Sequence, residues 1–195
     1  MDRASALALL HNHLRAANLR SHCLASEAIM RALARRLGQD EERWGLAGLL
    51  HDLDFEATRE EPGRHTVVAS QALRHAGIDD EVIDAIRHHN AEALNLQRST
   101  LFHHALAAAE TITGLIVASA LVQPDKKLAS VKPESVIKRM AKKDFARAVD
   151  RNVIRECEKL GLTLEEFVEL AVGAMQGVAG ELGGGGRSRC RPAKS

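Results

Sequence analysis

The chain has 195 residues, which is enough for one well-buried domain and short for two. Its 27 basic and 26 acidic residues give a formal net charge of +1, so no global charge favours nucleic acid or an anionic membrane as a partner. Aromatic residues make up only 3% of the chain, and Ala and Leu must therefore fill the interior, which suits closely packed helices.

Helical periodicity runs along the chain, and no segment shows the convincing alternation of a strand. We predict an all-α fold, a single compact bundle of about eight or nine helices. Gly38 is expected to end the second helix, Asp40 to cap the third, and the acidic segment 53–63 to form a loop. The predicted helices span residues 2–17, 21–37, 40–51, 64–76, 79–90, 99–123, 133–140, 145–160 and 163–182.

The C-terminal segment 183–195 has a different composition from the rest of the chain. Four glycines precede four basic residues, and no acidic residue accompanies them, so we expect a disordered tail after a domain at residues 1–182. The domain itself contains 23 basic and 26 acidic residues, a net charge of −3. The basic residues of the tail are Arg187, Arg189, Arg191 and Lys194.

The cysteines and the apolar runs bear on cellular location. Cys23, Cys157 and Cys190 have no metal-site spacing and cannot all pair, which favours a reducing cytoplasm. The N-terminus has no signal-peptide pattern, and no unbroken apolar run approaches the about 18 residues of a membrane span. We therefore expect a cytoplasmic protein with no membrane partner.

The most informative stretch is the apolar, small-residue segment 46–50, which runs directly into His51-Asp52, with Asp54 two residues further on. A charge beside such a segment is costly to bury unless it is paired or bound to a metal. An adjacent imidazole and carboxylate can supply nitrogen and oxygen to one metal ion, or the carboxylate can bridge two. Ordinary capping of the helix end is the alternative for this pair.

Other histidines are predicted to point inward because they share helical faces with apolar residues. His22 lies on one face with Ile29 and Leu33, His65 continues a stripe of alanines, and His89 lies on the apolar face of its helix. Glu110 interrupts an otherwise apolar helix and needs a partner, either a metal or a Lys or Arg. A hydrogen-bonded core histidine is the common explanation for each His alone, whereas a shared metal centre satisfies all of them together.

The order of these residues resembles the HD-domain superfamily of metal-dependent phosphohydrolases. The resemblance covers roughly residues 20–120, with 133–182 as a helical C-terminal extension, and implies a bundle of the HD-domain type. The chain through residue 182 is also similar to small bacterial HD-domain proteins of unassigned substrate, in the stretches Gly48-Leu49-Leu50-His51-Asp52-Leu53-Asp54, Thr113-Gly114-Leu115-Ile116-Val117-Ala118 and Pro124-Asp125-Lys126-Lys127-Leu128.

The resemblance implies a ligand set for one or two divalent transition metal ions. One metal would take His22, His51, Asp52 and Glu110, where the family usually has Asp as its last acid; the second would take His65 and His89, with Asp52 as the bridge. Such a mixture of nitrogen and oxygen ligands suits Fe, Mn, Ni, Co or Zn better than Ca. Two metals about 3.5–4 Å apart can neutralise a phosphoryl group and lower the pKa of a bridging water towards 7.

The expected activity is hydrolysis of a phosphate ester or anhydride in a nucleotide or small metabolite. Asp52 and Asp54 are the catalytic candidates, Asp54 as a proton relay unless it only caps the loop. His88, on the polar face beside His89, and Lys126 and Lys127, after the helix of Glu110, are the candidates for contacting substrate; a solvated face is the ordinary role of such lysines.

Two other classes of function stay open: a di-iron oxygenase on the same scaffold, resembling inositol oxygenase, and a non-catalytic metal- or ligand-binding domain. The expected partner is a small phosphorylated substrate. No specific nucleic acid is expected, and a homodimer is compatible with the sequence.

Overall fold

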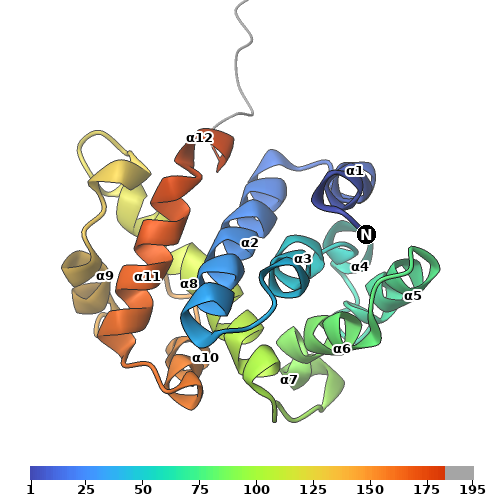
Figure 1. The fold of residues 1–195 in the computed structure, drawn as a ribbon. Coiled ribbons are helices and arrows are strands. Elements are labelled where there is room, and N and C mark those ends of the chain that lie inside the picture. The colour runs from blue at the N-terminus through green and yellow to red at the C-terminus, as the bar shows by residue number, and fades with distance from the viewer. Residues whose placement is uncertain (183–195) are drawn as a thin grey trace, which may run out of the picture.

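Two long helices, α2 (Ala17–Leu37) and α8 (Leu101–Leu121), form the centre of the fold. The computed structural model describes residues 1–182, which contain no strand, and it confirms the predicted all-α class (Figure 1). The predicted disordered tail lies outside the described residues. The other helices are α1 (Arg3–His13), α3 (Glu41–Leu50), α4 (Phe55–Thr58), α5 (Val67–His75), α6 (Asp80–His89), α7 (Ala91–Leu94), α9 (Pro133–Met140), α10 (Arg151–Ile154), α11 (Leu164–Gly177) and α12 (Ala179–Leu182), with 3-10 turns η1 (Leu128–Ser130) and η2 (Arg155–Leu160).

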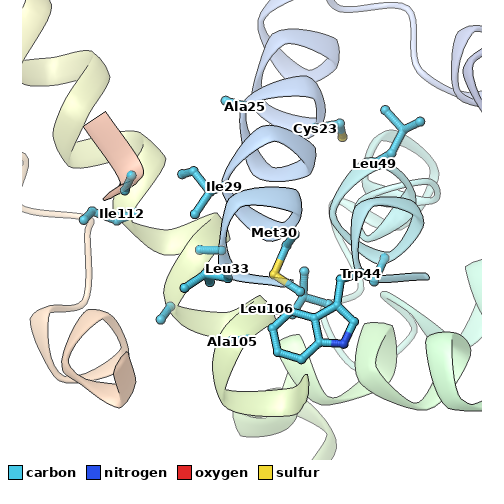
Figure 2. Close-up of a cluster of buried hydrophobic side chains, with 14 of the residues drawn as sticks. Cys23, Ala25, Ile29, Met30, Leu33, Trp44, Leu49, Ala105, Leu106 and Ile112 are labelled. Carbon is cyan, nitrogen blue, oxygen red and sulfur yellow. The ribbon is translucent and has the colours of Figure 1, made fainter. Parts of the chain in front are cut away.

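The hydrophobic core is built where α2 packs between α3 and α8 (Figure 2). Ile29 and Leu33 of α2 are fully buried there. The rings of Trp44 in α3 and Phe102 in α8 stack with their centroids 5.1 Å apart. Small aliphatic side chains supply most of the rest, as the aromatic-poor composition requires.

α8 is the helix whose composition most resembles a membrane span. Its most apolar window has a mean hydropathy of 1.5, and 61% of that window is buried inside the structure. A helix at the centre of a bundle has the same length and apolarity, because it contacts other helices on most of its faces.

Several predicted helix ends are confirmed by their caps. Asp40 accepts a hydrogen bond from Arg43 N at the start of α3, and Gly38 ends α2 in the left-handed region at φ 65°. Pro133 is the first residue of α9, and Thr163 and Glu166 form a capping box at the start of α11.

The helix predicted over residues 145–160 was wrong at its start. Residues 143–148 form turns, and α10 begins only at Arg151. Its N-cap is Asp150, which accepts a hydrogen bond from Asn152 N. The Arg151 guanidinium donates to the backbone carbonyls of Lys142, Phe145 and Ala146, which keeps these groups out of a helix. Hydrogen bonds from an arginine side chain to nearby backbone carbonyls leave no periodic pattern in a sequence.

Gly48 allows α3 to approach α2 closely, which brings the end of α3 to the centre of the protein. A Cβ atom at Gly48 would lie 2.7 Å from Ser26 O and 2.8 Å from Glu27 N, both in the backbone of α2. A backbone cannot move aside as a flexible side chain can. Only a residue without a side chain at position 48 lets α3 come close enough to α2 to bring His51 and Asp52 to the centre of the protein.

We expect Gly48→Ala to lower the free energy of unfolding by about 1–3 kcal/mol or more, as overpacked sites do. Gly173→Ala in α11 is the matched control, because no atom lies within 4 Å of a Cβ there, and its effect should be within about 1 kcal/mol, towards higher stability. Chemical denaturation of both variants measures the difference. Equal stability of the two would show that α2 and α3 can separate without cost.

Candidate metal centre

Five helices or their flanking turns bring the predicted ligands together. His22 comes from α2, and His51 and Asp52 follow the end of α3. His65 lies in the turn before α5, and His89 is the last residue of α6. Glu110 lies on α8. The segments are far apart in the sequence, so the cluster exists only in the folded chain.

Asp52 lies between two pairs of histidines. Its Oδ2 atom is 3.6 Å from His22 Nε2 and 3.7 Å from His51 Nε2. Its Oδ1 atom is 3.3 Å from His65 Nε2 and 3.5 Å from His89 Nε2. We call Asp52 Oδ2 with His22 and His51 the first half-site, and Asp52 Oδ1 with His65 and His89 the second half-site. A single carboxylate is thus placed to bridge two cations.

Hydrogen bonds fix the ring protons of the first half-site. His51 Nδ1 donates to Gly48 O at 2.9 Å, because a carbonyl can only accept. His22 Nδ1 lies 2.8 Å from the Thr113 hydroxyl, whose own proton is donated to Glu110 O, so this histidine also donates from Nδ1. The two Nε2 atoms, 3.0 Å apart, therefore direct lone pairs at the same space.

The second half-site has the same arrangement. His89 Nδ1 donates to Ile86 O at 2.7 Å, and His65 Nδ1 donates to Asp54 Oδ1 at 2.8 Å. The two Nε2 atoms are 3.1 Å apart. Lone pairs that face one another at this distance repel unless a cation or a proton lies between them. Metal-binding histidines typically donate a hydrogen bond from their other ring nitrogen to a carbonyl or carboxylate. His51, His65 and His89 do so, and His22 donates to a hydroxyl instead.

The two half-sites differ in how strongly they hold protons in the absence of metal. Burial lowers the pKa of His51 to about 3, against the opposing effect of Asp52. Burial also disfavours charge on His65, but hydrogen bonds to Asp52 and Asp54 outweigh it and raise the pKa of His65 to about 9. A proton on His65 therefore occupies the second half-site at neutral pH when no metal is bound.

We expect metal affinity at the second half-site to rise about tenfold per pH unit as the pH approaches 9, because each metal bound there releases the His65 proton. The His51 imidazole is already neutral above about pH 3 and adds no such dependence. Calorimetric titration of metal-free protein in two buffers of different ionisation enthalpy counts the protons released. Asp54→Asn removes one of the charges that raise the pKa and should lower the pH at which the affinity stops rising; an unchanged pH there would remove His65 from the second half-site.

Asp54 lies behind His65, on the side away from Asp52. Its Oδ1 accepts from His65 Nδ1 and from Thr66 N, and its Oδ2 accepts from Ala69 N at 2.7 Å. The side chain is 3% exposed. These contacts hold the turn before α5 and orient His65, which is a positioning role. The proton-relay role predicted for Asp54 stays a prediction, and none of these contacts supports it.

Glu110 lies at the edge of the first half-site. Its Oε2 is 3.9 Å from His22 Nε2, and its Oε1 accepts a hydrogen bond from the Thr111 hydroxyl. Burial raises the pKa of its carboxyl group. Within residues 1–182, no Lys or Arg pairs with Glu110, so the structure does not supply the alternative partner considered above.

Glu110→Gln should weaken metal binding at the first half-site by about 10–100-fold or more, because it removes a charge that balances the cation. Glu110→Asp should retain binding. Metal titration and thermal melts of both variants separate a ligand from a structural group. An unchanged metal dissociation constant for Glu110→Gln, with only a lower melting temperature, would exclude Glu110 from the site.

His88 does not face the metal centre. Its Nδ1 donates to Asp84 O at 2.8 Å, and its ring stacks on His103 with centroids 3.8 Å apart. His103 Nε2 lies 2.8 Å from Asp84 Oδ2, so the three residues form a separate group between α6 and α8. The substrate contact predicted for His88 stays a prediction and gains no support from this geometry.

Arg98 is a supporting residue that sequence reasoning missed. Its guanidinium is 7% exposed and donates to the backbone carbonyls of His88 and His89, at 2.8 and 2.9 Å. It also pairs with Glu156 of η2 at 2.9 Å. Arg98 therefore fixes the end of α6, where His89 must point inward. Its position in a loop gave no periodic signal.

Comparison with known proteins assigns the family. The model of the HD domain family matches residues 19–120, just over half of the chain. The chain belongs to the HD domain family, which places it in a superfamily of metal-dependent phosphohydrolases. The match contains every ligand predicted above.

The similar curated proteins are much longer. Ribonuclease Y 2 of Levilactobacillus brevis is 31% identical over 97 residues, which are 50% of this chain and 18% of the relative. Ribonuclease Y of Thermus thermophilus is 36% identical over 81 residues, 40% of this chain and 14% of the relative. The chain thus spans less than a fifth of their length. No solved structure matches the chain.

Proposed function

We propose that this protein is a metal-dependent phosphohydrolase that cleaves a phosphate ester or phosphoanhydride of a nucleotide or a small phosphorylated metabolite. The observation that carries the proposal is the pair of half-sites around Asp52, with four imidazole lone pairs directed at two adjacent positions. Membership in the HD domain family supports the same class of reaction.

The chemistry of the donor set fits divalent transition metals. Neutral imidazoles and carboxylates bind Fe, Mn, Ni, Co or Zn in preference to Ca. His22, His51, Asp52 and Glu110 would hold one ion, and Asp52, His65 and His89 a second. When bound, such ions neutralise phosphoryl charge and lower the pKa of water towards 7.

The protein residues contribute orientation and charge balance. Asp52 supplies negative charge between the half-sites, and its pKa is lowered well below the usual value because neighbouring histidines outweigh the effect of burial. Gly48 O, Thr113 and Asp54 hold the imidazoles in the metal-binding tautomer. With few carboxylates among the ligands, a loaded centre keeps net positive charge, which favours an anionic substrate.

Metal analysis combined with a substrate panel tests the proposal. The purified protein should contain a transition metal, and it should hydrolyse at least one of a set of nucleotides, dinucleotide polyphosphates and small phosphomonoesters. Absence of metal after reconstitution would favour the non-catalytic alternative. Oxygen consumption with a non-phosphate substrate, together with a mixed-valence iron signal, would favour the oxygenase.

A second candidate substrate is RNA, because the similar curated proteins are named ribonuclease Y. The similarity is confined to part of the chain, and the net charge of −3 over residues 1–182 gives no general attraction to a polyanion. A short single-stranded RNA belongs in the panel for this reason.

A further inference from the structure

A cavity of about 850 Å³ adjoins the metal centre. His22 of the first half-site lines it from α2, and Thr113, which accepts a hydrogen bond from His22 Nδ1, lines it from α8. Glu110 precedes Thr113 by one turn of the same helix. Of the predicted ligands only His22 lines this cavity, so a substrate whose phosphoryl group lies at the metal centre would reach the cavity past His22.

The far end of the cavity carries two cations. Lys126 and Lys127 line it from the turn after α8. Asp125 holds this turn by accepting hydrogen bonds from Lys127 N at 3.1 Å and from the Ser130 hydroxyl at 2.6 Å. Lys126 has a left-handed backbone with φ 52°, which is unusual for a residue other than Gly and is found where a structure constrains the chain.

The wall between the two ends is aliphatic. Val117 and Leu121 of α8 are 46% and 60% exposed, and the buried Met175 of α11 also lines the cavity. Apart from the His22 imidazole, the lining contains no aromatic ring on which a base could stack, and it contains no carboxylate that would repel an anion. Neighbouring large apolar side chains exposed on one face typically mark a binding surface.

We call this cavity, from His22 to Lys126 and Lys127, the groove. Its length sets the size of the ligand. From Glu110 to Leu121, α8 rises about 16 Å at about 1.5 Å per residue. A compact sugar phosphate is too short to reach from the metal centre to the lysines, whereas an extended chain of about dodecyl length is long enough.

We propose that the groove binds an aliphatic chain and that the substrate is a phosphorylated aliphatic molecule with a second anionic group near Lys126 and Lys127. The part of this inference that concerns which bond is cleaved rests on the proposed phosphohydrolase function. The Arg-rich segment after residue 182 is a poor occupant, because its basic residues and the two lysines repel one another.

Calorimetric titration of the metal-loaded protein with butyl-, octyl- and dodecylphosphonate tests the groove without requiring hydrolysis. Affinity should rise with chain length, by up to about fourfold for each methylene that becomes buried. Val117→Asp should lower dodecylphosphonate affinity by about tenfold or more. Leu101→Asp is the matched control, because Leu101 lies on the same helix, is also 46% exposed and does not line the groove.

A dodecylphosphonate with a terminal carboxylate tests the lysine end. It should bind more tightly than dodecylphosphonate at low salt, and the gain should disappear when Lys126 and Lys127 are both replaced by Met. Affinity independent of chain length, or equal losses in Val117→Asp and Leu101→Asp, would overturn the proposal. If the protein sediments as a dimer and Val117→Asp dissociates it while Leu101→Asp does not, the groove would belong to a second copy of the chain. If dodecylphosphonate binds more tightly after Arg187, Arg189 and Arg191 are replaced by Ser, the groove would belong to the C-terminal segment.

The same compounds as phosphate esters distinguish the two proposals. Chain-length-dependent binding without hydrolysis of any phosphate would retain the groove and reject the phosphohydrolase. Hydrolysis of short phosphates without any dependence on chain length would retain the phosphohydrolase and reject the groove.

Discussion

Asp52→Ala should remove metal from both half-sites at once and abolish hydrolysis. Each oxygen of Asp52 faces a different pair of histidines, so no other residue described here connects the two half-sites. Loss of a residue that merely supports a ligand costs about 10–100-fold in metal affinity. Loss of a shared ligand should cost more than that at both positions.

Metal content by elemental analysis, activity and a thermal melt of the same preparation measure the effect of Asp52→Ala. Asp80→Ala is a suitable control, because the Asp80 side chain is 91% exposed and belongs to none of the His-Asp groups that could hold a metal, so the metal content should stay unchanged. His51→Ala should reproduce the loss at the first half-site. Full metal content in folded Asp52→Ala would refute the assignment of the centre.

His89→Ala should reduce the metal content to about one ion per chain, because it takes a ligand from the second half-site only. His88→Ala should leave the stoichiometry unchanged. The two residues are neighbours at the end of α6, but His89 Nε2 is 3.5 Å from Asp52, whereas the His88 ring stacks on His103. The pair of variants thus controls for any general disturbance of the helix end.

Titration of each of these two variants with the metal found in the wild-type protein gives the number and affinity of its sites. Asp54→Asn should lie between them, since it weakens the orientation of His65 without removing a ligand. If His88→Ala lost an ion and His89→Ala did not, the assignment of inward and outward faces on α6 would be wrong.

Much of the fold is predictable because local signals and packing agree. Helix boundaries near Gly38, Asp40, Pro133 and Thr163 follow from capping chemistry that acts within one turn. The start of α10 was not predictable, because Arg151 binds carbonyls of a preceding turn and this interaction has no periodic pattern.

The identities of the clustered site residues were predictable, but their supporting contacts were not. His22, His65 and His89 were expected to point inward from helical periodicity, and the structure gathers them and His51 around Asp52. Which ring nitrogen faces the centre depends on partners such as Thr113 and Gly48 O, which only the folded chain supplies.

The ion pair between Arg98 and Glu156 connects the end of α6, which carries His89, to a segment outside the region that matches the HD family. Glu156 lies in η2, outside residues 19–120, and also contacts His104 Nδ1 of α8 at 2.7 Å. Because thermodynamic coupling is reciprocal, a metal held by His89 should slow amide hydrogen exchange in η2, and loosening η2 should weaken that metal. A fragment ending at residue 120 would lack Glu156 and with it the ion pair that supports the contact of Arg98 with the end of α6.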